Sequence, residues 1–296
     1  MDKEFIDIAV IATMSAGKST LVNSLLGTEL MHSANEATTA KITILEQDNQ
    51  LDKYIGSAKL DSGIRLKSHK GVNAEVLREW NRDSRVVEVL LKGPFENVAP
   101  LAKPIRIYDT PGPNNSQDET HGQILEDFLS KNKLDVVLYV LNATQIGIND
   151  DQDLLKLLIN KASKNIGNII FIINKIDSLD EERGETRLSV TEKVTKYLEN
   201  NGVNSQFLKN IVCMSAETVL VASKYMRNQK LTISERFALI KLVNVARSKK
   251  EFLTYQDFDK FEYKHKIDIL NGLVKDSGIL NLNLILTNLL KGEKND

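Results

Sequence analysis

Apolar and polar positions alternate in blocks along the chain. Short continuous runs of Val, Ile and Leu, such as LDVVLYVLNA and NIIFIINKID, predict buried strands, whereas apolar residues three or four positions apart predict helices. The expected strands cover residues 5–11, 41–47, 85–95, 103–112, 134–143, 168–177 and 211–216. The expected helices cover residues 19–26, 74–82, 119–131, 150–164, 180–200, 232–247, 256–275 and 279–291.

This alternation of continuous apolar strands with helices predicts an α/β fold. The sheet is expected to be mainly parallel, with helices on both faces and ligands bound beyond the carboxyl ends of the strands. A length of 296 residues suits one large α/β domain or two small ones. The last segment, ILNLNLILTNLL, is apolar on most sides, so it is expected to pack against the sheet.

The first strand runs into a loop of small residues and then a helix, the arrangement of a phosphate-binding P-loop. Backbone N–H groups of such a loop form a nest for phosphate oxygens, Lys18 adds a positive charge, and the Ser19 hydroxyl is placed to bind Mg²⁺. The first glycine of the usual pattern is Ala12 here, so ordinary backbone angles are expected at that position. The alternative is a strand–turn–helix with a chance GKS sequence. The candidate nucleotide-binding residues are Thr13, Met14, Ser15, Ala16, Gly17, Lys18, Ser19 and Thr20.

A second motif, DTPG, closes the strand at 103–112. Asp109 can hold the Mg²⁺ shell through a water, and the Gly112 N–H can reach the γ-phosphate where a side chain would crowd it. The same four residues also suit an ordinary turn, which is the alternative interpretation.

A third motif, NKID, follows the strand at 168–177. The Asp177 carboxylate can accept hydrogen bonds from guanine N1 and N2, a donor pair that adenine lacks. The stem of Lys175 can cover the base and Asn174 can brace the loop. Ser215 and Ala216 fit the loop that contacts guanine O6, although that signal is weak alone. An ordinary strand-end turn is the alternative.

Thr38 and Thr39 lie between the P-loop and DTPG. A threonine here can bind Mg²⁺ through its hydroxyl and orient the attacking water through its carbonyl. Of the two, Thr38 fits this role slightly better. The alternative interpretation is that NEATTA is a polar surface loop. Pro113 follows DTPG, so no glutamine is placed to position water. The P-loop and the first switch loop also contain no arginine, which predicts slow hydrolysis by a monomer.

The composition is that of an ordinary globular protein, with 42% hydrophobic and 27% charged residues. The net charge of −1 gives no overall field that favours nucleic acid, so no nucleic-acid partner is expected. A single cysteine, Cys213, excludes an internal disulfide framework and fits a cytoplasmic protein. MDKEF leads directly into the first strand without a signal peptide, and no apolar run reaches the roughly 18 residues of a membrane span.

Together, SAGKST, NEATTA, DTPGPN and NKID resemble the motifs of the dynamin superfamily of large GTPases, and bacterial dynamin-like proteins in particular. A long stretch separates Thr39 from Asp109, and VVEVLLKGPFENV is similar to the dynamin strand that ends in a Gly-Pro turn. The resemblance covers residues 5–216 and resumes at 276–290. It implies one dynamin-type GTPase domain over 1–296, with 217–275 as a helical insertion and 279–291 as the closing helix.

The resemblance also implies activity and partners. It implies binding of GTP and GDP with Mg²⁺, hydrolysis of GTP, a homodimer formed through the nucleotide face, and a membrane-remodelling process. Ser15 matches the serine that stabilises the transition state and a catalytic monovalent cation, K⁺ or Na⁺. Met14 stands where dynamin has a glutamine, and its thioether cannot donate a hydrogen bond. The residues expected to act in catalysis are Ser15, Lys18, Thr38, Thr39 and Gly112, and those expected to bind metal are Ser19, Thr38 and Asp109.

Three functional hypotheses follow. The first is a GTPase located in the cytoplasm or peripherally at the inner face of a membrane, with membrane or protein partners bound through additional helical regions. The second is a nucleotide-dependent switch or scaffold with negligible hydrolysis, favoured by Met14 and Pro113. The third is a P-loop ATPase, which requires NKID to be accidental. Residues 224–275 are net basic, which is typical of a solvated face, with a lipid or partner patch as the alternative.

Overall fold

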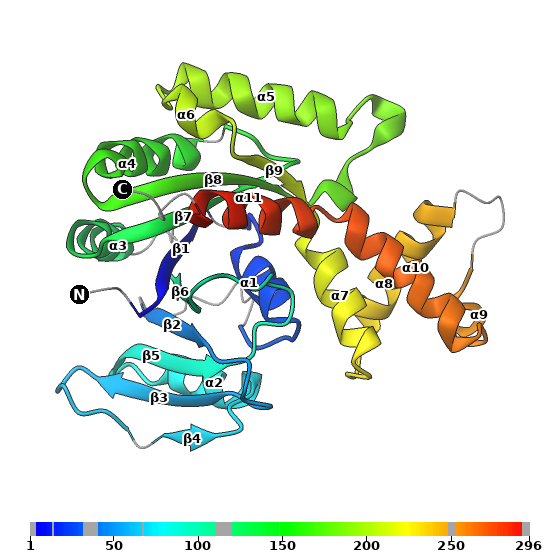
Figure 1. The fold of residues 1–296 in the computed structure, drawn as a ribbon, viewed down its shortest axis with the longest axis horizontal. Coiled ribbons are helices and arrows are strands. Elements are labelled where there is room, and N and C mark those ends of the chain that lie inside the picture. The colour runs from blue at the N-terminus through cyan, green and yellow to red at the C-terminus, as the bar shows by residue number, and fades with distance from the viewer. Residues whose placement is uncertain are drawn as a thin grey trace.

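The strands form a single mixed sheet in the order β4-β3-β5-β2-β6-β1-β7-β8-β9. The computed structural model describes residues 4–13, 15–31, 41–66, 68–110, 120–147, 149–247 and 253–291. The strands are β1 (Ile6–Ala12), β2 (Ile42–Gln47), β3 (Ile55–Leu60), β4 (His69–Lys70), β5 (Val86–Gly93), β6 (Ile105–Asp109), β7 (Leu134–Asn142), β8 (Ile166–Asn174) and β9 (Ile211–Met214). Figure 1 shows them running from β9 at the top to β4 at the bottom.

The helices connect these strands and extend beyond them. They are α1 (Lys18–Leu26), α2 (Ala74–Arg82), α3 (Thr120–Lys131), α4 (Asn149–Asn165), α5 (Arg187–Asn200), α6 (Ser205–Leu208), α7 (Ala216–Met226), α8 (Ile233–Arg247), α9 (Tyr255–Asp259), α10 (Tyr263–Asp276) and α11 (Ile279–Lys291). Two short 3₁₀ helices, η1 (Ile176–Ser178) and η2 (Glu181–Arg183), follow β8.

The sheet has a parallel half and an extension. The strands β6, β1, β7, β8 and β9 are all parallel to one another. In the extension, β2 pairs antiparallel with β6 and parallel with β5, and β3 pairs antiparallel with both β5 and β4. This architecture confirms the predicted α/β fold with a mainly parallel sheet.

Helices cover both faces of the parallel half because its strands are apolar on both sides. On one face, Leu138 of β7 lies in a buried cluster with residues of α1, α7 and α11. On the other face, Tyr139 lies in a cluster with residues of α3, α4 and α5. The closing helix α11 packs on the sheet as expected, with Leu282 and Leu286 buried, but Leu280 and Leu284 on its outer side are exposed.

The helices α7–α10, residues 216–276, form what we call the helical lobe, which projects to the right in Figure 1. The lobe has a hydrophobic cluster of its own, in which Phe258 of α9 and Leu270 of α10 are fully buried. The division of the chain into one domain with an insertion at 217–275 stays a prediction.

The structure differs from the expected elements mainly in the extension and the lobe. The strands β3 and β4 were not expected, because IGSAKL is built of small and polar residues. The strand expected at 211–216 ends at Met214, since the Ser215 side chain caps α7, a helix that the pattern analysis missed.

Two expected helices also have different bounds. The helix expected at 180–200 begins at Arg187, because Gly184 adopts a left-handed conformation and Thr186 forms a capping box with Ser189. The helix expected at 256–275 is broken into α9 and α10. A straight helix would place Phe258 and Leu270 roughly 18 Å apart, whereas both lie in the core of the lobe.

Candidate functional site

The predicted site segments follow four strands of the parallel half. Residues 13–20 follow β1, Asp109 ends β6, Asn174 ends β8, and Ser215 follows β9. Because these strands are parallel, their carboxyl ends lie at the same edge of the sheet. The fold therefore gathers segments that are up to two hundred residues apart in the sequence.

The P-loop has the backbone of an anion-binding turn. Ala12 is the last residue of β1, so the position of the missing glycine is extended, as expected. Ser15 and Gly17 have positive φ angles of 62° and 91°. Gly17 is the N-cap of α1, and no side chain caps the first turn of this helix. The first N–H groups of α1 are therefore available for an anion, which the helix dipole also favours.

Asn174 ties the P-loop to the segment after β9. Its Nδ2 donates to the Ala16 carbonyl at 3.0 Å, and its Oδ1 accepts from the Ala216 N–H at 3.0 Å. Asn174 is almost fully buried, so both bonds are shielded from water. A β-carbon at Gly17 would collide with the Asn174 amide, so this glycine also makes room for the bridge.

The loop after β8 places Asp177 beside Ser215. The Ser215 hydroxyl donates to Asp177 Oδ1, and the main chain turns at Lys175, which has a φ of 67°. Ser215 thus makes two contacts, because its side chain also caps the N-terminus of α7 through the Thr218 N–H. The Asp177 carboxylate is thereby fixed in direction, and its other oxygen accepts from the Ser178 hydroxyl at 3.3 Å.

Charged groups also meet at the phosphate side. Lys18 Nζ forms an ion pair with Asp109 Oδ1, and both side chains are largely buried. Beside them, the Thr110 hydroxyl donates to the Val10 carbonyl at 3.0 Å and joins the end of β6 to β1. A phosphate would offer Lys18 a second anionic partner at this position.

The donor set suits Mg²⁺. Ser19 in the first turn of α1 supplies a hydroxyl and Asp109 a carboxylate, and hard oxygen donors are what this ion prefers. Within the described ranges, no group of three or more His, Cys, Asp and Glu side chains converges on one point. Met14, Thr38, Thr39 and Gly112 lie outside the described residues, so their predicted roles stay predictions.

Pattern analysis missed two residues near the site. Asn23, inside α1, is buried, and its side chain accepts from the N–H groups of Leu30 and Met31 and donates to the Met31 carbonyl. Lys241 of α8 donates to the Asp177 carbonyl at 3.4 Å. Asn23 carries a detectable signal, an amide among the apolar positions of a helix, but Lys241 follows only from the tertiary structure.

The Glu217 carboxyl lies in the first turn of α7, beside this site. Partial burial and the nearby Asp177 charge raise the pKa of Glu217, while Lys241 and Lys175 act in the opposite direction.

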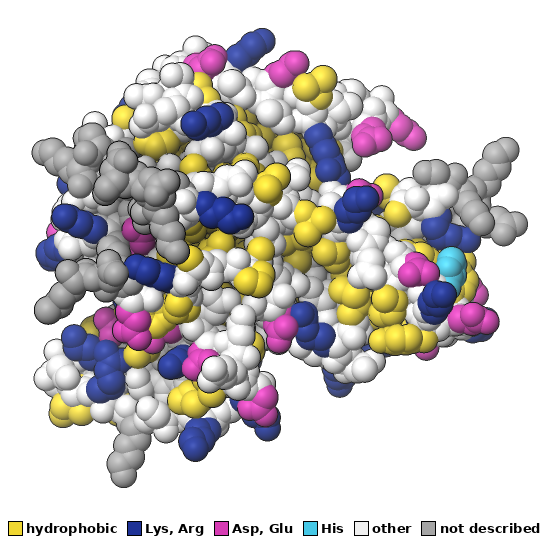
Figure 2. Space-filling model, in the orientation of Figure 1, with side chains coloured by type: hydrophobic (Ala, Val, Ile, Leu, Met, Phe, Trp, Pro, Cys, Tyr) yellow, Lys and Arg dark blue, Asp and Glu magenta, His cyan; other side chains and the backbone are white. Residues whose placement is uncertain are grey.

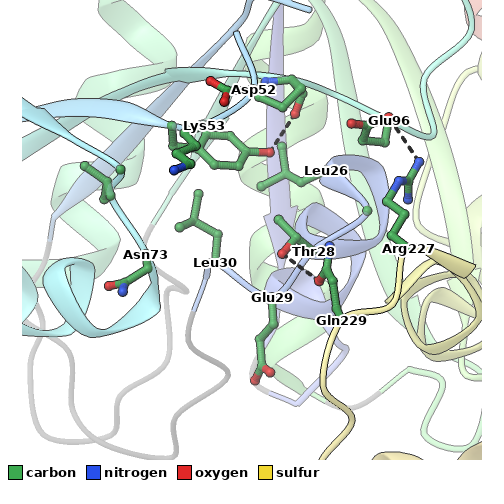
Figure 3. A pocket seen from close by; sticks show the side chains of 15 residues that line it. Leu26, Thr28, Glu29, Leu30, Asp52, Lys53, Asn73, Glu96, Arg227 and Gln229 are labelled. Atoms are coloured by element: carbon green, nitrogen blue, oxygen red, sulfur yellow. Dashed lines mark hydrogen bonds and ion pairs between the residues drawn. The ribbon is translucent and has the colours of Figure 1, made fainter. Parts of the chain in front are cut away.

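A cavity of about 340 Å³ lies away from these loops, at the far end of α1. Figure 3 shows Leu26 and Leu30 among its lining side chains and the ion pair between Arg227 and Glu96 at the right. Because α1 has nine residues, the cavity is separated from the P-loop by the length of that helix, about 13 Å. It is therefore distinct from the predicted nucleotide site.

The fold and site define a P-loop protein of the GTPase type. The family model of the dynamin family matches residues 8–176, which is more than half of the chain. The chain belongs to the dynamin family. No curated protein matches it.

The solved structures that the chain resembles are distant from it in sequence. One is described as an oligomerised bacterial dynamin pair that provides a mechanism for long-range sensing and tethering of membranes, with 17% identity, a TM-score of 0.50, and coverage of 83% of this chain and 38% of that one. LeoA, a bacterial dynamin GTPase from ETEC, has 13% identity, a TM-score of 0.41, and coverage of 97% and 40%. An Era variant from Aquifex aeolicus bound to GDP.AlF4- has 18% identity, a TM-score of 0.42, and coverage of 84% and 69%. The chain thus spans about two fifths of the length of each dynamin that it resembles.

No helix in the described part of the chain combines the length and the apolar character needed to cross a bilayer.

Proposed function

We propose that the chain binds GTP with Mg²⁺ and hydrolyses it to GDP and phosphate. The observation that carries this proposal is the Asn174 bridge, which joins the P-loop to Ala216 and places Asp177 at the same edge of the sheet. A chance P-loop sequence would not account for two further segments joined to it in this way. The alternative of an ATPase is disfavoured because the Asp177 carboxylate matches the N1 and N2 donors of guanine and not adenine.

Each part of the site has a separate role in this proposal. The uncapped first turn of α1 and the P-loop N–H groups bind the phosphates, and Lys18 exchanges part of its pairing with Asp109 for the β- and γ-phosphates. Ser15, Thr38, Thr39 and Gly112 are proposed to orient the water and stabilise the charge that develops on the γ-phosphate. Ser19 and a threonine would bind Mg²⁺ directly, and Asp109 would hold it through a water molecule. The ion would offset the negative charge on the phosphate oxygens.

The residues proposed to bind the guanine base are held in position by their neighbours. The Ser215 hydroxyl holds the Asp177 carboxylate. The stem of Lys175, whose backbone is left-handed, is proposed to cover the plane of the base. The Ala216 N–H is engaged by Asn174, so the proposed contact to guanine O6 needs that hydrogen bond to be shared.

Activation by pairing of two chains across the nucleotide is part of the proposal. The sequence has no arginine in the P-loop and has Pro113 after DTPG, so a partner surface or a monovalent cation, K⁺ or Na⁺, would supply the missing stabilisation. The oligomerised dynamin pair with the same fold supports self-association, and its membrane tethering supports a peripheral membrane-associated role. The second candidate function is a switch with negligible hydrolysis. It is favoured by the lack of an arginine in the P-loop, by Pro113 after DTPG and by Met14.

The test is a calorimetric titration of the whole chain with GTP, GDP and ATP in the presence of Mg²⁺. We expect both guanine nucleotides to bind and ATP to bind at least a hundredfold more weakly. Lys18→Met is expected to abolish GTP binding, whereas the exposed Lys156→Met on α4 serves as the matched control. A folded wild-type chain that takes up no guanine nucleotide would refute the assignment.

Turnover then separates the two candidate functions. We expect the rate per chain to rise with protein concentration over a hundredfold range and to rise further when potassium replaces sodium. A flat specific rate would contradict the dimer. An absence of chemistry under single-turnover conditions with the chain in excess would favour the switch.

A further inference from the structure

Helix α7 begins beside the loop that is proposed to bind the guanine base. Its N-cap is Ser215, and the third residue of the helix is Thr218. Both residues are almost fully buried, at 3% and 4% exposure. A buried hydroxyl must find its hydrogen-bond partners inside the protein, so the bonds of these two side chains can be accounted for one by one.

The Ser215 hydroxyl uses all of its hydrogen-bonding positions. A serine hydroxyl has one proton to donate and two lone pairs that accept. Its partners are the Asp177 carboxylate, the Thr218 N–H at 3.2 Å and the Thr218 hydroxyl at 2.7 Å. An ionised carboxylate can only accept, so the Ser215 proton is committed to Asp177. The Thr218 hydroxyl must therefore be the donor in the bond between the two hydroxyl groups.

The three side chains thus form a chain of hydrogen bonds with one direction. Thr218 donates to Ser215, and Ser215 donates to Asp177 Oδ1. Hydrogen bonds in such a chain polarise one another, so the Thr218 hydroxyl strengthens the bond that Ser215 makes to the carboxylate. With both lone pairs engaged, the Ser215 hydroxyl has a single arrangement that satisfies every partner.

The Asp177 side chain is held less firmly from its other side. Asp177 is partly buried, and its second oxygen accepts from the hydroxyl of the exposed Ser178 at 3.3 Å. That bond is longer than a usual bond between a hydroxyl and a carboxylate, and it lies where water competes for both groups. The direction of the Asp177 carboxylate is therefore set mainly by the buried hydroxyl groups of α7. This direction matters because two adjacent N–H donors need both carboxylate oxygens in one plane.

We propose that Thr218 is a positioning residue that determines how strongly the site selects guanine. It acts through Ser215, whose hydroxyl it holds in the direction of Asp177. This inference rests on the proposed function, in which Asp177 accepts from N1 and N2 of guanine. The group that the site selects is then the 2-amino group, which inosine nucleotides lack. Loss of the Thr218 hydroxyl should weaken the double contact to guanine more than the single contact to hypoxanthine.

The experiment compares the affinities of the whole chain for GDP and inosine diphosphate, both with Mg²⁺, by calorimetric titration. We expect the wild-type chain to bind GDP at least about tenfold more tightly, because GDP offers one more donor to a charged acceptor. Thr218→Val keeps the shape of the side chain and removes the hydroxyl. It is expected to weaken GDP binding by about fivefold and inosine diphosphate binding by less than about twofold. Thr218→Ser keeps the hydroxyl and should restore most of the preference.

A control on the same helix separates positioning from a loss of stability. Ser223 of α7 is fully buried, and its hydroxyl accepts from Asn97 Nδ2 at 2.8 Å. Ser223→Ala should lower the free energy of unfolding in urea and leave the ratio of the two affinities unchanged. Thr218→Ala tests the same hydroxyl if Thr218→Val fails to fold.

The outcomes are distinct for the inference and for the proposed function. Equal weakening of both nucleotides in Thr218→Val, an unchanged preference, or the same selective loss in Ser223→Ala would overturn the inference. Equal affinity of the wild-type chain for the two nucleotides would also overturn it, because the 2-amino group would then make no contact. A folded wild-type chain that binds neither nucleotide would instead refute the proposed function itself, and the inference with it.

Discussion

The two halves of the sheet differ in how they are covered. Strand β7 in the parallel half is buried almost throughout, with Leu138 and Tyr139 facing opposite clusters. Strand β5 in the extension is less completely buried: Val89 and Leu91 are buried, but Leu90 between them is only partly buried and Val87 is 43% exposed. Figure 2 shows the extension, at the lower left, covered largely by charged and other polar groups.

This difference separates the half of the sheet that carries the predicted site from the half that does not. All described site segments follow strands of the two-sided parallel half, where loops at one edge are held by a rigid scaffold. The extension contributes Lys41, whose ammonium donates to the carbonyls of Trp80, Asn81 and Asp83 at the end of α2. These three hydrogen bonds tie the start of β2 to the end of α2 within the extension, and burial lowers the pKa of Lys41.

The largest expected effect tests whether the parallel half carries base recognition. Asp177→Asn should weaken GTP binding by at least about a hundredfold and shift the preference toward xanthosine triphosphate, because the amide cannot accept both guanine donors. Competition binding with the two nucleotides measures the change. The exposed Asp153→Asn on α4 is the control, and an unchanged preference would place base recognition elsewhere.

The next effect tests the difference in burial between the two halves of the sheet. The same change, Val to Thr, is made once in β7 and once in β5. Val137→Thr in β7 puts a hydroxyl into a fully buried position and should lower the free energy of unfolding by about 1–3 kcal/mol. Val87→Thr in β5 should change it by less than about 0.5 kcal/mol, because that side chain already meets water. Urea unfolding at fixed pH compares them, and equal losses would show that Val87 is covered in solution as Val137 is.

The smallest effect concerns the edge of the site. The raised pKa of Glu217 means that the folded chain binds this proton more tightly than the unfolded chain does, so the stability associated with Glu217 is present at low pH and is lost as pH rises above its usual pKa near 4.5. Glu217→Gln should therefore be stabilising relative to wild type near pH 7 and lose that advantage near pH 4. Urea unfolding across this range, without nucleotide, checks the sign; a difference independent of pH would contradict it.

Sequence patterns identified the elements that are determined by residues close together in the chain. Continuous apolar runs predicted β1, β7 and β8, and the small residues before GKST predicted the P-loop that leads into α1. Gly27, directly after the expected helix at 19–26, ends α1 in a left-handed conformation and donates its N–H to the Asn23 carbonyl. These features depend on a few neighbouring residues, so they can be read without the fold.

The elements that the pattern missed depend on distant partners. The strand β3 is stabilised by pairing with β5 and has little apolar periodicity of its own. The break between α9 and α10 follows from the shared core of the lobe, and Gly278 is needed because a side chain there would collide with the Cys213 carbonyl of β9. No local pattern encodes such approaches between segments.

By itself, the sequence determined the strand–helix alternation and the residue types of the site. The spacing of apolar residues and the chemistry of each side chain are local properties of the chain. Only the tertiary structure decided that Asn174 bridges Ala16 and Ala216, and that Ser215 directs Asp177. The same is true of Lys224, which joins the lobe to Glu29. Each of these contacts links residues far apart in the chain, and their geometry exists only once the parallel strands have brought their carboxyl ends to one edge.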